Sequence, residues 1–291
     1  MIMSEEAFTR MPHSCALKIQ AMYPNLKSAE RRAVDFLMAN PERVSTLNIV
    51  DFASMAECSE ATAVRMAKRL GYEGFIELRR AFDLHRNAEP EGVYPEIDSR
   101  DPIPVMLEKV FNSSMSSLSD TLRILDVDQF TRAVDALVES RQILFCGIGD
   151  GGVVARESYL RWLKVGHAAY ETSDADEQLF FATRLERGDV MLAFSHSGRS
   201  RTVNNAAKLA RKRGATVIAV TNYPVSPLVK TSDIILQTAV FATFANFEVI
   251  AKRLAQLCIV ECLFIGFLQK MGKPYIKRML ACEESVKPNK V

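Results

Sequence analysis

Apolar residues recur at two different spacings along the chain. Up to Arg86 they recur every three or four positions, which is the spacing of amphipathic helices. The segments with this spacing are Glu30–Met38, Ile49–Met55, Ala61–Leu70 and Phe75–Leu84. We therefore predict that the first part of the chain is helical.

After Pro104 the pattern changes to short apolar runs separated by amphipathic stretches such as Val203–Lys212. The runs are Ile143–Cys146, Val190–Phe194 and Thr216–Val220. Strands and helices alternate in this way where crossover helices connect parallel strands. The predicted fold class is an all-α helix-turn-helix domain followed by a doubly wound α/β domain with a parallel sheet flanked by helices. Two longer segments are expected as helices packed around the sheet: Val105–Leu125 and Phe247–Gln269.

The segment between Arg86 and Pro104 separates the two patterns. It contains Pro90, Pro95, Pro102 and Pro104 with several acidic residues and almost no apolar periodicity, which is typical of a linker. The predicted organisation is a helix-turn-helix domain at residues 1–87, a linker at 88–104 and an α/β domain at 105–291.

The composition, 48% hydrophobic and 25% charged, is that of a chain that can bury a core. The formal net charge of +2 is too small for a chain-wide polyanion-binding surface, so any contact with nucleic acid requires a local cluster of basic residues. The six cysteines form no CxxC pair, and we expect reduced thiols, no metal and no cofactor. Cys258 and Cys262 lie in an apolar run and are expected in the core.

The first residues of the chain include acidic side chains and no continuous apolar segment, so they do not resemble a secretory signal. The longest apolar stretch, Cys258–Leu268, is interrupted by Glu261 and is shorter than the ~20 residues of a membrane-spanning helix. We expect a cytoplasmic protein that does not bind a membrane.

Helix-start and helix-stop signals frame one segment of the first domain. Ser59 can accept a hydrogen bond from the amides of the next turn, and Gly71 can end a helix in the left-handed conformation. They predict a helix at Glu60–Leu70, after a short helix at Ile49–Met55 and a tight turn. The second helix of such a helix-turn-helix enters the major groove of DNA.

The predicted second helix has one packing side, with Ala63, Ala67 and Leu70, and one basic side. Arg65 is expected to contact a base or a phosphate. The other basic residues are expected to bind the DNA backbone and so position the protein, and the small residues permit the helix to approach the DNA closely. The predicted DNA-binding residues are Ser59, Ala61, Thr62, Arg65, Lys68 and Arg69. The alternative is that the basic side is only a solvated surface.

Hydroxyl side chains cluster where the run Val190–Phe194 ends, in "AFSHSGRSRT". Ligands bind at the carboxyl ends of parallel strands, and the next helix offers unpaired amides to an anion. The residues of this junction that we expect to bind an anionic effector are Ser195, Ser197, Gly198, Ser200 and Thr202. The alternative is a serine-rich loop that only caps a helix.

A glycine-rich junction follows the first apolar run, in "LFCGIGDGGVVA". It matches GxGxxG, so a dinucleotide-binding fold is an alternative, but that fold also needs an acidic residue for the ribose. Asp174 and Asp176 are the nearest candidates, and their context indicates a helix start. Gly149 and Gly151 are therefore assigned to the effector site.

The stretches "LKSAERRAVDFLMANPERV" and "SEATAVRMAKRLGYEGFIELR" resemble the N-terminal domain of the RpiR family of bacterial transcription regulators. The residues at family motif positions are Ser59, Thr62, Arg65, Leu70, Gly71, Gly74, Phe75 and Leu78. The resemblance implies a double-stranded DNA operator with two half-sites and a homodimer or homotetramer that reads it. Glu57 and Cys58 depart from the glycine and valine common in the family's inter-helix turn.

Residues from Val105 to Met279 resemble the sugar isomerase (SIS) domain, which binds phosphorylated sugars. The resemblance is carried by the serine-rich junction, by Thr221 and by "SPL" at Ser226–Leu228. The family commonly has serine at Gly151, so one hydroxyl ligand is missing here, and Asp150 places a negative charge beside it.

A sugar isomerase needs a paired acid and base on the sugar. The candidates are His196, which belongs to the anion loop, Glu261, which is expected to make an interhelical hydrogen bond, and Glu248, which is assigned to effector contact. No acid/base pair emerges. The predicted function is a non-enzymatic DNA-binding regulator whose operator affinity is controlled by a phosphorylated sugar; the alternative is a sugar-phosphate isomerase with an accessory helical domain.

Overall fold

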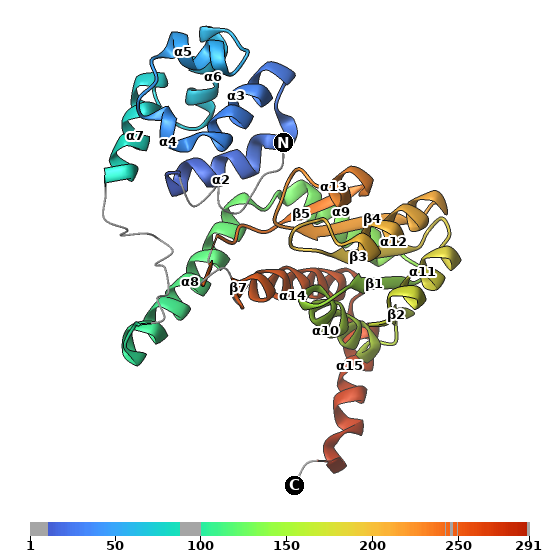
Figure 1. The fold of residues 1–291 in the computed structure, drawn as a ribbon. Coiled ribbons are helices and arrows are strands. Elements are labelled where there is room, and N and C mark those ends of the chain that lie inside the picture. The colour runs from blue at the N-terminus through green and yellow to red at the C-terminus, as the bar shows by residue number, and fades with distance from the viewer. Residues whose placement is uncertain (1–10, 88–99, 242, 245–246, 249, 290–291) are drawn as a thin grey trace. The chain divides into compact units, whose positions relative to one another are not determined.

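The computed structural model describes residues 11–87, 100–241, 243–244, 247–248 and 250–289 (Figure 1). The chain divides into two compact units, which are described separately. The first unit comprises the described parts of Met1–Ile124 and of Ala239–Ala251, and the second comprises Leu125–Thr238 and the described part of Lys252–Val291.

The first unit is helical, as predicted. Its elements in chain order are α2 (His13–Met22), η1 (Tyr23–Asn25), α3 (Ser28–Ala39), α4 (Pro41–Val44), α5 (Ile49–Met55), α6 (Glu60–Arg69), α7 (Phe75–Asn87) and α8 (Ile103–Ile124). Phe52 is fully buried and its ring packs against Phe36 and Phe75, with centroid distances of 5.3 and 4.8 Å. This aromatic cluster ties α3, α5 and α7 together.

The long helix α8 belongs to the first unit and contacts α2. Its buried residues are polar, namely Ser113, Ser117, Asp120 and Thr121. The prediction of a helix at Val105–Leu125 is thus confirmed to within two residues. The two core clusters of the sheet, however, draw their buried residues from other helices.

A short hairpin occupies part of a predicted helix. The strands β6 (Thr243–Phe244) and β7 (Phe247–Glu248) pair antiparallel, and α14 begins only at Ala251 and continues to Met271. The prediction of a helix starting at Phe247 was therefore wrong by one turn, because an apolar run of this length does not distinguish a strand from a helix.

The second unit is a doubly wound α/β domain, and the predicted fold class is confirmed. Five parallel strands lie in the order β2-β1-β3-β4-β5. They are β1 (Ile143–Gly147), β2 (Ala169–Glu171), β3 (Val190–Phe194), β4 (Thr216–Thr221) and β5 (Ile234–Gln237). Every residue of β1 and β3 is buried, as expected for strands covered on both faces.

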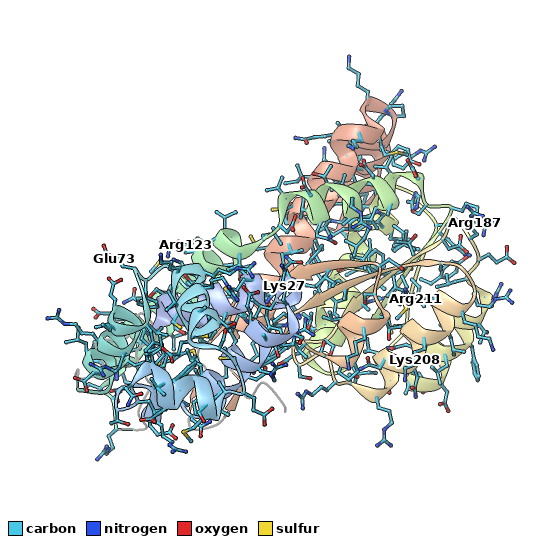
Figure 2. The ribbon with its side chains drawn as sticks, turned by 90° about the horizontal axis from the view of Figure 1, so that it is seen from above. Lys27, Glu73, Arg123, Arg187, Lys208 and Arg211 are labelled. Carbon is cyan, nitrogen blue, oxygen red and sulfur yellow. The ribbon has the colours of Figure 1, made fainter. Side chains whose placement is uncertain are left out.

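Helices cover both faces of this sheet (Figure 1). One face packs against α9 (Val127–Glu139), α10 (Asp150–Lys164) and α14, and the other against α11 (Ala175–Arg184), α12 (Arg201–Lys212) and α13 (Pro227–Thr231). The helix α15 (Lys273–Ser285) and the turn η2 (Lys287–Asn289) follow. Lys208 and Arg211 extend from the exposed side of α12 (Figure 2), opposite its buried alanines.

The first core face is built around Trp162, which is the single tryptophan of the chain and is fully buried. Its ring lies 5.3 Å from Phe145 of β1 and 5.0 Å from Phe264 of α14. Strand, crossover helix and C-terminal helix therefore share one aromatic contact, which is directional as well as hydrophobic.

The helix α14 is long and apolar enough to cross a membrane by length and composition, with 39% of its most apolar window buried. Its buried residues include Leu263 and Phe267, which belong to the core of the sheet, so it serves as a core helix here. Cys258 and Cys262 lie on its exposed side, so the expectation that they are core residues was wrong.

Candidate functional site

The recognition helix of the first unit is framed by the two residues that predicted it. The Oγ atom of Ser59 accepts a hydrogen bond from the Thr62 amide at 3.2 Å, and Gly71 has φ of +88°. Helix α6 ends at Arg69, one residue before the predicted boundary. Local capping chemistry therefore fixes where this helix starts and ends.

Thr62 is placed differently from the expectation, because it is 3% exposed rather than part of the open side. Its hydroxyl lies 2.9 Å from the Ser59 hydroxyl and accepts from Nη2 of Arg65 at 3.1 Å. Thr62 thus holds the Arg65 guanidinium at the start of the helix. Arg65 itself is exposed, as predicted.

Arg69 is held by a partner on another helix. Its Nη1 atom lies 2.7 Å from a carboxylate oxygen of Glu30, whose side chain is only 10% exposed. This ion pair joins α6 to α3, so Arg69 has a structural contact that the sequence pattern did not indicate. Arg69 is still exposed, as are Ala61, Arg65 and Lys68 of the same helix.

The turn between α5 and α6 contains Glu57 with φ of +50°, the one positive φ among described non-glycine residues. This is the left-handed region that glycine adopts without steric cost. The Glu57 carbonyl accepts from Nε of Arg32 on α3 at 2.9 Å. The turn therefore keeps a conformation suited to glycine although a larger residue occupies it.

The second unit has a topological switch point between β1 and β3, from which α10 and α12 leave on opposite faces. Neither helix has a side-chain cap: Gly149, with φ of +60°, precedes α10, and Ser200 precedes α12. By contrast, Asp126 and Asp174 cap α9 and α11. The amides at the switch point therefore remain available to an anion.

The position of Asp174 argues against the alternative of a dinucleotide-binding fold. Its carboxylate accepts from the amides of Asp176 and Glu177, both at 2.9 Å. These acidic residues start a helix, as the sequence indicated, so the acid that a ribose would need is committed to α11.

The serine-rich loop after β3 is folded against the end of β4. The His196 carbonyl accepts from the Asn222 amide at 2.9 Å, and the Gly198 carbonyl accepts from the Leu228 amide at 3.1 Å and from Nδ2 of Asn204 at 3.1 Å. Ser195 is buried, and Ser197 is exposed with its Oγ accepting from the Arg199 amide. The loop is thus rigid, with the Ser197 hydroxyl at its surface.

Packing inside the protein requires a glycine at position 198, and its expected role in ligand approach stays a prediction. It is buried with φ of +63°, and an added Cβ would lie 2.1 Å from Oγ of Ser226 and 3.2 Å from Oγ1 of Thr221. The glycine lets the loop pass directly beside the N-cap of α13. Ser200 and Thr202 are half-buried at the start of α12.

Gly151 lies in the first turn of α10, close to the end of β3. An added Cβ would be 2.6 Å from the Phe194 carbonyl oxygen. The residue before it, Asp150, lies 3.5 Å from Nε of Arg253, at the start of α14. The missing hydroxyl therefore reflects close packing of helix on strand, and the negative charge has a cation beside it.

Lys252 is the functional candidate that sequence reasoning missed. It is 2% exposed, although lysine is almost never fully buried unless a charge stabilises it. Burial of the ring, and to a smaller extent the positive charge of Lys252, lower the pKa of His196 to about 3. Lys252 and Arg253 together bring two cations from the first turn of α14 to the ends of β1 and β3.

Two glutamates complete the set of candidates. The side chain of Glu248 lies outside the described residues, so its assignment to the effector stays a prediction. Glu261 forms an ion pair with Arg161 of α10, which confirms an interhelical role.

A cavity of about 740 Å³ opens on the β2 side of β1. Its walls include Gly149 from the glycine-rich junction and Ser173 after β2. The residues from Ser195 to Thr202 do not line it. The structure therefore groups the hydroxyl loop with Thr221 and Ser226, and groups Gly149 with the separate cavity.

Comparison with known proteins identifies both units. Residues 13–86 match the helix-turn-helix domain of the rpiR family, and residues 136–266 match the SIS domain. An uncharacterized HTH-type transcriptional regulator of Caldanaerobacter subterraneus is 27% identical, covering 94% of this chain and 97% of the relative. The uncharacterized regulator YbbH of Bacillus subtilis is also 27% identical, covering 92% and 96%.

Solved structures of transcription regulators are also similar to this chain. NanR of Vibrio vulnificus, determined in complex with ManNAc-6P, is 26% identical with a TM-score of 0.61, covering 94% of this chain and 98% of NanR. The sugar isomerase domain of an RpiR transcription factor from Sphaerobacter thermophilus has the same fold, with a TM-score of 0.56 at 20% identity, covering 65% and 99%.

A helix-turn-helix domain followed by an SIS domain defines a class of transcriptional regulators. The chain belongs to the RpiR family of that class, which confirms the resemblance drawn from its motifs.

Replacing Gly151 by serine is expected to destabilise the second unit by about 1–3 kcal/mol, because the added atoms meet a backbone carbonyl that cannot turn aside. Thermal unfolding measured by calorimetry tests this. Gly152→Ala is the graded control, since its Cβ would be 3.3 Å from the Gly147 carbonyl oxygen and should cost less. Equal stability of wild type and Gly151→Ser would contradict the packing account.

Neutral His196 should make stability pH-dependent. Its pKa is about 3 in the folded chain against an ordinary value of 6.5, so below pH 6.5 the unfolded state binds the proton more readily and unfolding becomes easier until about pH 3. His196→Gln should flatten the fall in melting temperature over this range. His167→Gln is the control and should flatten it less, because burial lowers the pKa of His167 by a smaller amount. An unchanged pH profile in His196→Gln would disprove the assignment.

Proposed function

We propose that this protein binds a double-stranded DNA operator through α6 and that a phosphorylated sugar, bound at the switch point of the SIS domain, controls its operator affinity. It acts in the cytoplasm as a homodimer or homotetramer, because two copies of α6 are needed to read two half-sites. The single observation that carries the proposal is the buried Lys252 beside the hydroxyl loop and the two uncapped helices.

Support for DNA binding comes from the fixed orientation of a basic side chain in α6. Arg65 is exposed and its guanidinium is oriented by Thr62, so less freedom is lost when it contacts a base or phosphate. Lys68 lies on the same helix and can contact the backbone. Arg69 contributes by keeping α6 fixed on α3.

Support for an anionic effector comes from charge and hydrogen-bond donors that meet at one place. The first turn of α12 supplies amides, Ser197 supplies a hydroxyl and Lys252 supplies a positive charge. NanR, whose sequence aligns over nearly the whole chain, was crystallised with ManNAc-6P. A phosphorylated amino sugar is therefore the first effector class to test.

Among the side chains that the structure describes, neither His196 nor Glu261 suits the role of the base that an isomerase needs. A general base works best with a pKa near the operating pH, and His196 has a pKa of about 3. Glu261 is engaged with Arg161 on the neighbouring helix. A putative sugar-phosphate isomerase from Listeria monocytogenes has a similar fold, so the fold alone does not separate the two functions. We assign this chain the sensor role on its own residues and on its regulator relatives.

Arg65→Ala should weaken operator binding by about 1–3 kcal/mol if the side chain contacts a guanine edge. The operator is first selected from a random duplex library, and affinity is then measured by fluorescence anisotropy. Lys68→Ala is the comparison: it should weaken all duplexes alike and reduce the salt slope by about one. Unaltered affinity in Arg65→Ala would reject its role in DNA recognition.

Ser197→Ala and Lys252→Met should abolish the response to sugar phosphate while leaving effector-free DNA affinity unchanged. The probes are glucose 6-phosphate, fructose 6-phosphate, glucosamine 6-phosphate and N-acetylmannosamine 6-phosphate. A bound probe stabilises the fold by about 2.7 kcal/mol at a concentration 100 times its Kd, so binding appears as a rise in melting temperature.

Ser173→Ala is the matched control, because Ser173 lines the separate cavity beside β2. A response lost in Ser173→Ala and kept in Ser197→Ala would place the effector in that cavity. Turnover of any of the four sugar phosphates would favour the isomerase alternative.

A further inference from the structure

A chain of buried polar contacts starts at the hydroxyl loop of the SIS domain. The His196 carbonyl accepts from the Asn222 amide at 2.9 Å and from Oγ1 of Thr221 at 3.1 Å. Thr221 is fully buried and Asn222 is 1% exposed. The loop after β3 is therefore tied to the end of β4 by bonds that water does not reach.

The same two residues hold the end of β5. The Thr238 amide donates to the Thr221 carbonyl at 2.9 Å, and the Thr238 hydroxyl donates to Oδ1 of Asn222 at 3.0 Å. Thr238 is also fully buried. Asn222 thus contacts the hydroxyl loop through its main chain and the end of the sheet through its side chain.

The next residue along the chain, Ala239, belongs to the first unit. The Ala239 amide donates to Oγ1 of Thr121 at 3.0 Å, with Ala239 fully buried and Thr121 5% exposed. Thr121 is in α8, the helix that contacts α2 of the helical unit. One peptide bond, between Thr238 and Ala239, therefore separates the contacts of the sheet from the contacts of α8.

Burial makes these contacts act as a set. A buried donor or acceptor that loses its partner cannot turn to water, so the bonds resist separate rupture. A displacement of the His196 main chain is then passed to Asn222 and Thr238 more easily than it is absorbed between them. Packed interiors switch between discrete arrangements instead of deforming continuously.

We propose that Asn222, Thr238 and Thr121 couple the effector site to the DNA-binding unit. When the hydroxyl loop closes on an effector, the His196 carbonyl moves, Asn222 and Thr238 follow, and Ala239 shifts α8 through its bond to Thr121. This inference rests on the proposed function, because it assigns the route by which that effector alters operator affinity. The three residues are positioning residues and are not expected to touch either ligand.

The decisive variants are Thr238→Val and Thr121→Val, which keep the side-chain shape and remove one hydroxyl each. Ser114→Ala is the matched control on α8, since its hydroxyl donates to the Val110 carbonyl within the same helix. Three quantities are measured with the full chain: affinity for the selected duplex without effector, calorimetric affinity for the four sugar phosphates, and the ratio of duplex affinities with and without the sugar phosphate that binds.

Both threonine variants should bind duplex and sugar phosphate within about threefold of the wild type. Their affinity ratio should fall toward one, from a wild-type value in the range of about 5 to 150 that is usual for such couplings. Ser114→Ala should keep the wild-type ratio. A wild-type ratio in both threonine variants would overturn the proposal.

If either variant fails to fold, hydrogen exchange of the wild type decides the matter. Adding the bound sugar phosphate should change exchange in peptides that cover residues 236–241 and in α8. A change confined to residues 195–204 would overturn the proposed route.

If none of the four sugar phosphates binds the wild type, the proposed function fails on its own, and the link is still tested without ligand. The melting temperatures of Thr238→Val, Thr121→Val and the double variant then form a cycle. A double variant that departs from the sum of the single variants supports the physical link, and additive shifts overturn it.

Discussion

Parallel pairing of β1 with β3 is the constraint on which the proposed effector site depends. The register places Gly147 beside Phe194, so the two strands end together. Because β2 and β4 continue the sheet in opposite directions, the helices after β1 and β3 must leave on opposite faces. Their free amides are therefore left at one edge without any residue having to be placed there by a long-range contact.

Close packing at that edge explains the unusual residues around it. Gly151 and Gly198 both occupy positions where a Cβ would strike a neighbour, the Phe194 carbonyl in one case and Ser226 in the other. Arg253 lies beside Asp150 and balances its charge in the same region, whereas Lys252 lies near the neutral ring of His196.

Local signals in the sequence were sufficient for much of the fold. Ser59 and Gly71 located α6 because caps act within a single turn. The strands β1, β3 and β4 were visible as short runs made up mostly of apolar residues. The edge strand β2 has three residues that are not fully buried, so it carries no apolar signal. Membership in the RpiR family followed from motif residues rather than from periodicity.

Three features that escaped prediction depend on contacts between distant segments. Thr62 becomes buried only when the unit folds, and Arg69 forms an ion pair with Glu30, which lies 39 residues away in the sequence. Lys252 was passed over because a lysine in a helical pattern is normally solvated, and only the folded chain encloses it. The positions of Thr62 and Lys252 could not be read from spacing, because tertiary packing decides burial.

The lone indole of the chain has a practical consequence. Since Trp162 is enclosed between Phe145 and Phe264, selective excitation of tryptophan emission reports on the α/β unit and is silent for the helices that carry the DNA-reading surface. Emission and helical ellipticity, followed side by side during chemical denaturation, would therefore reveal whether the two halves of the molecule lose their structure in one cooperative step or in two.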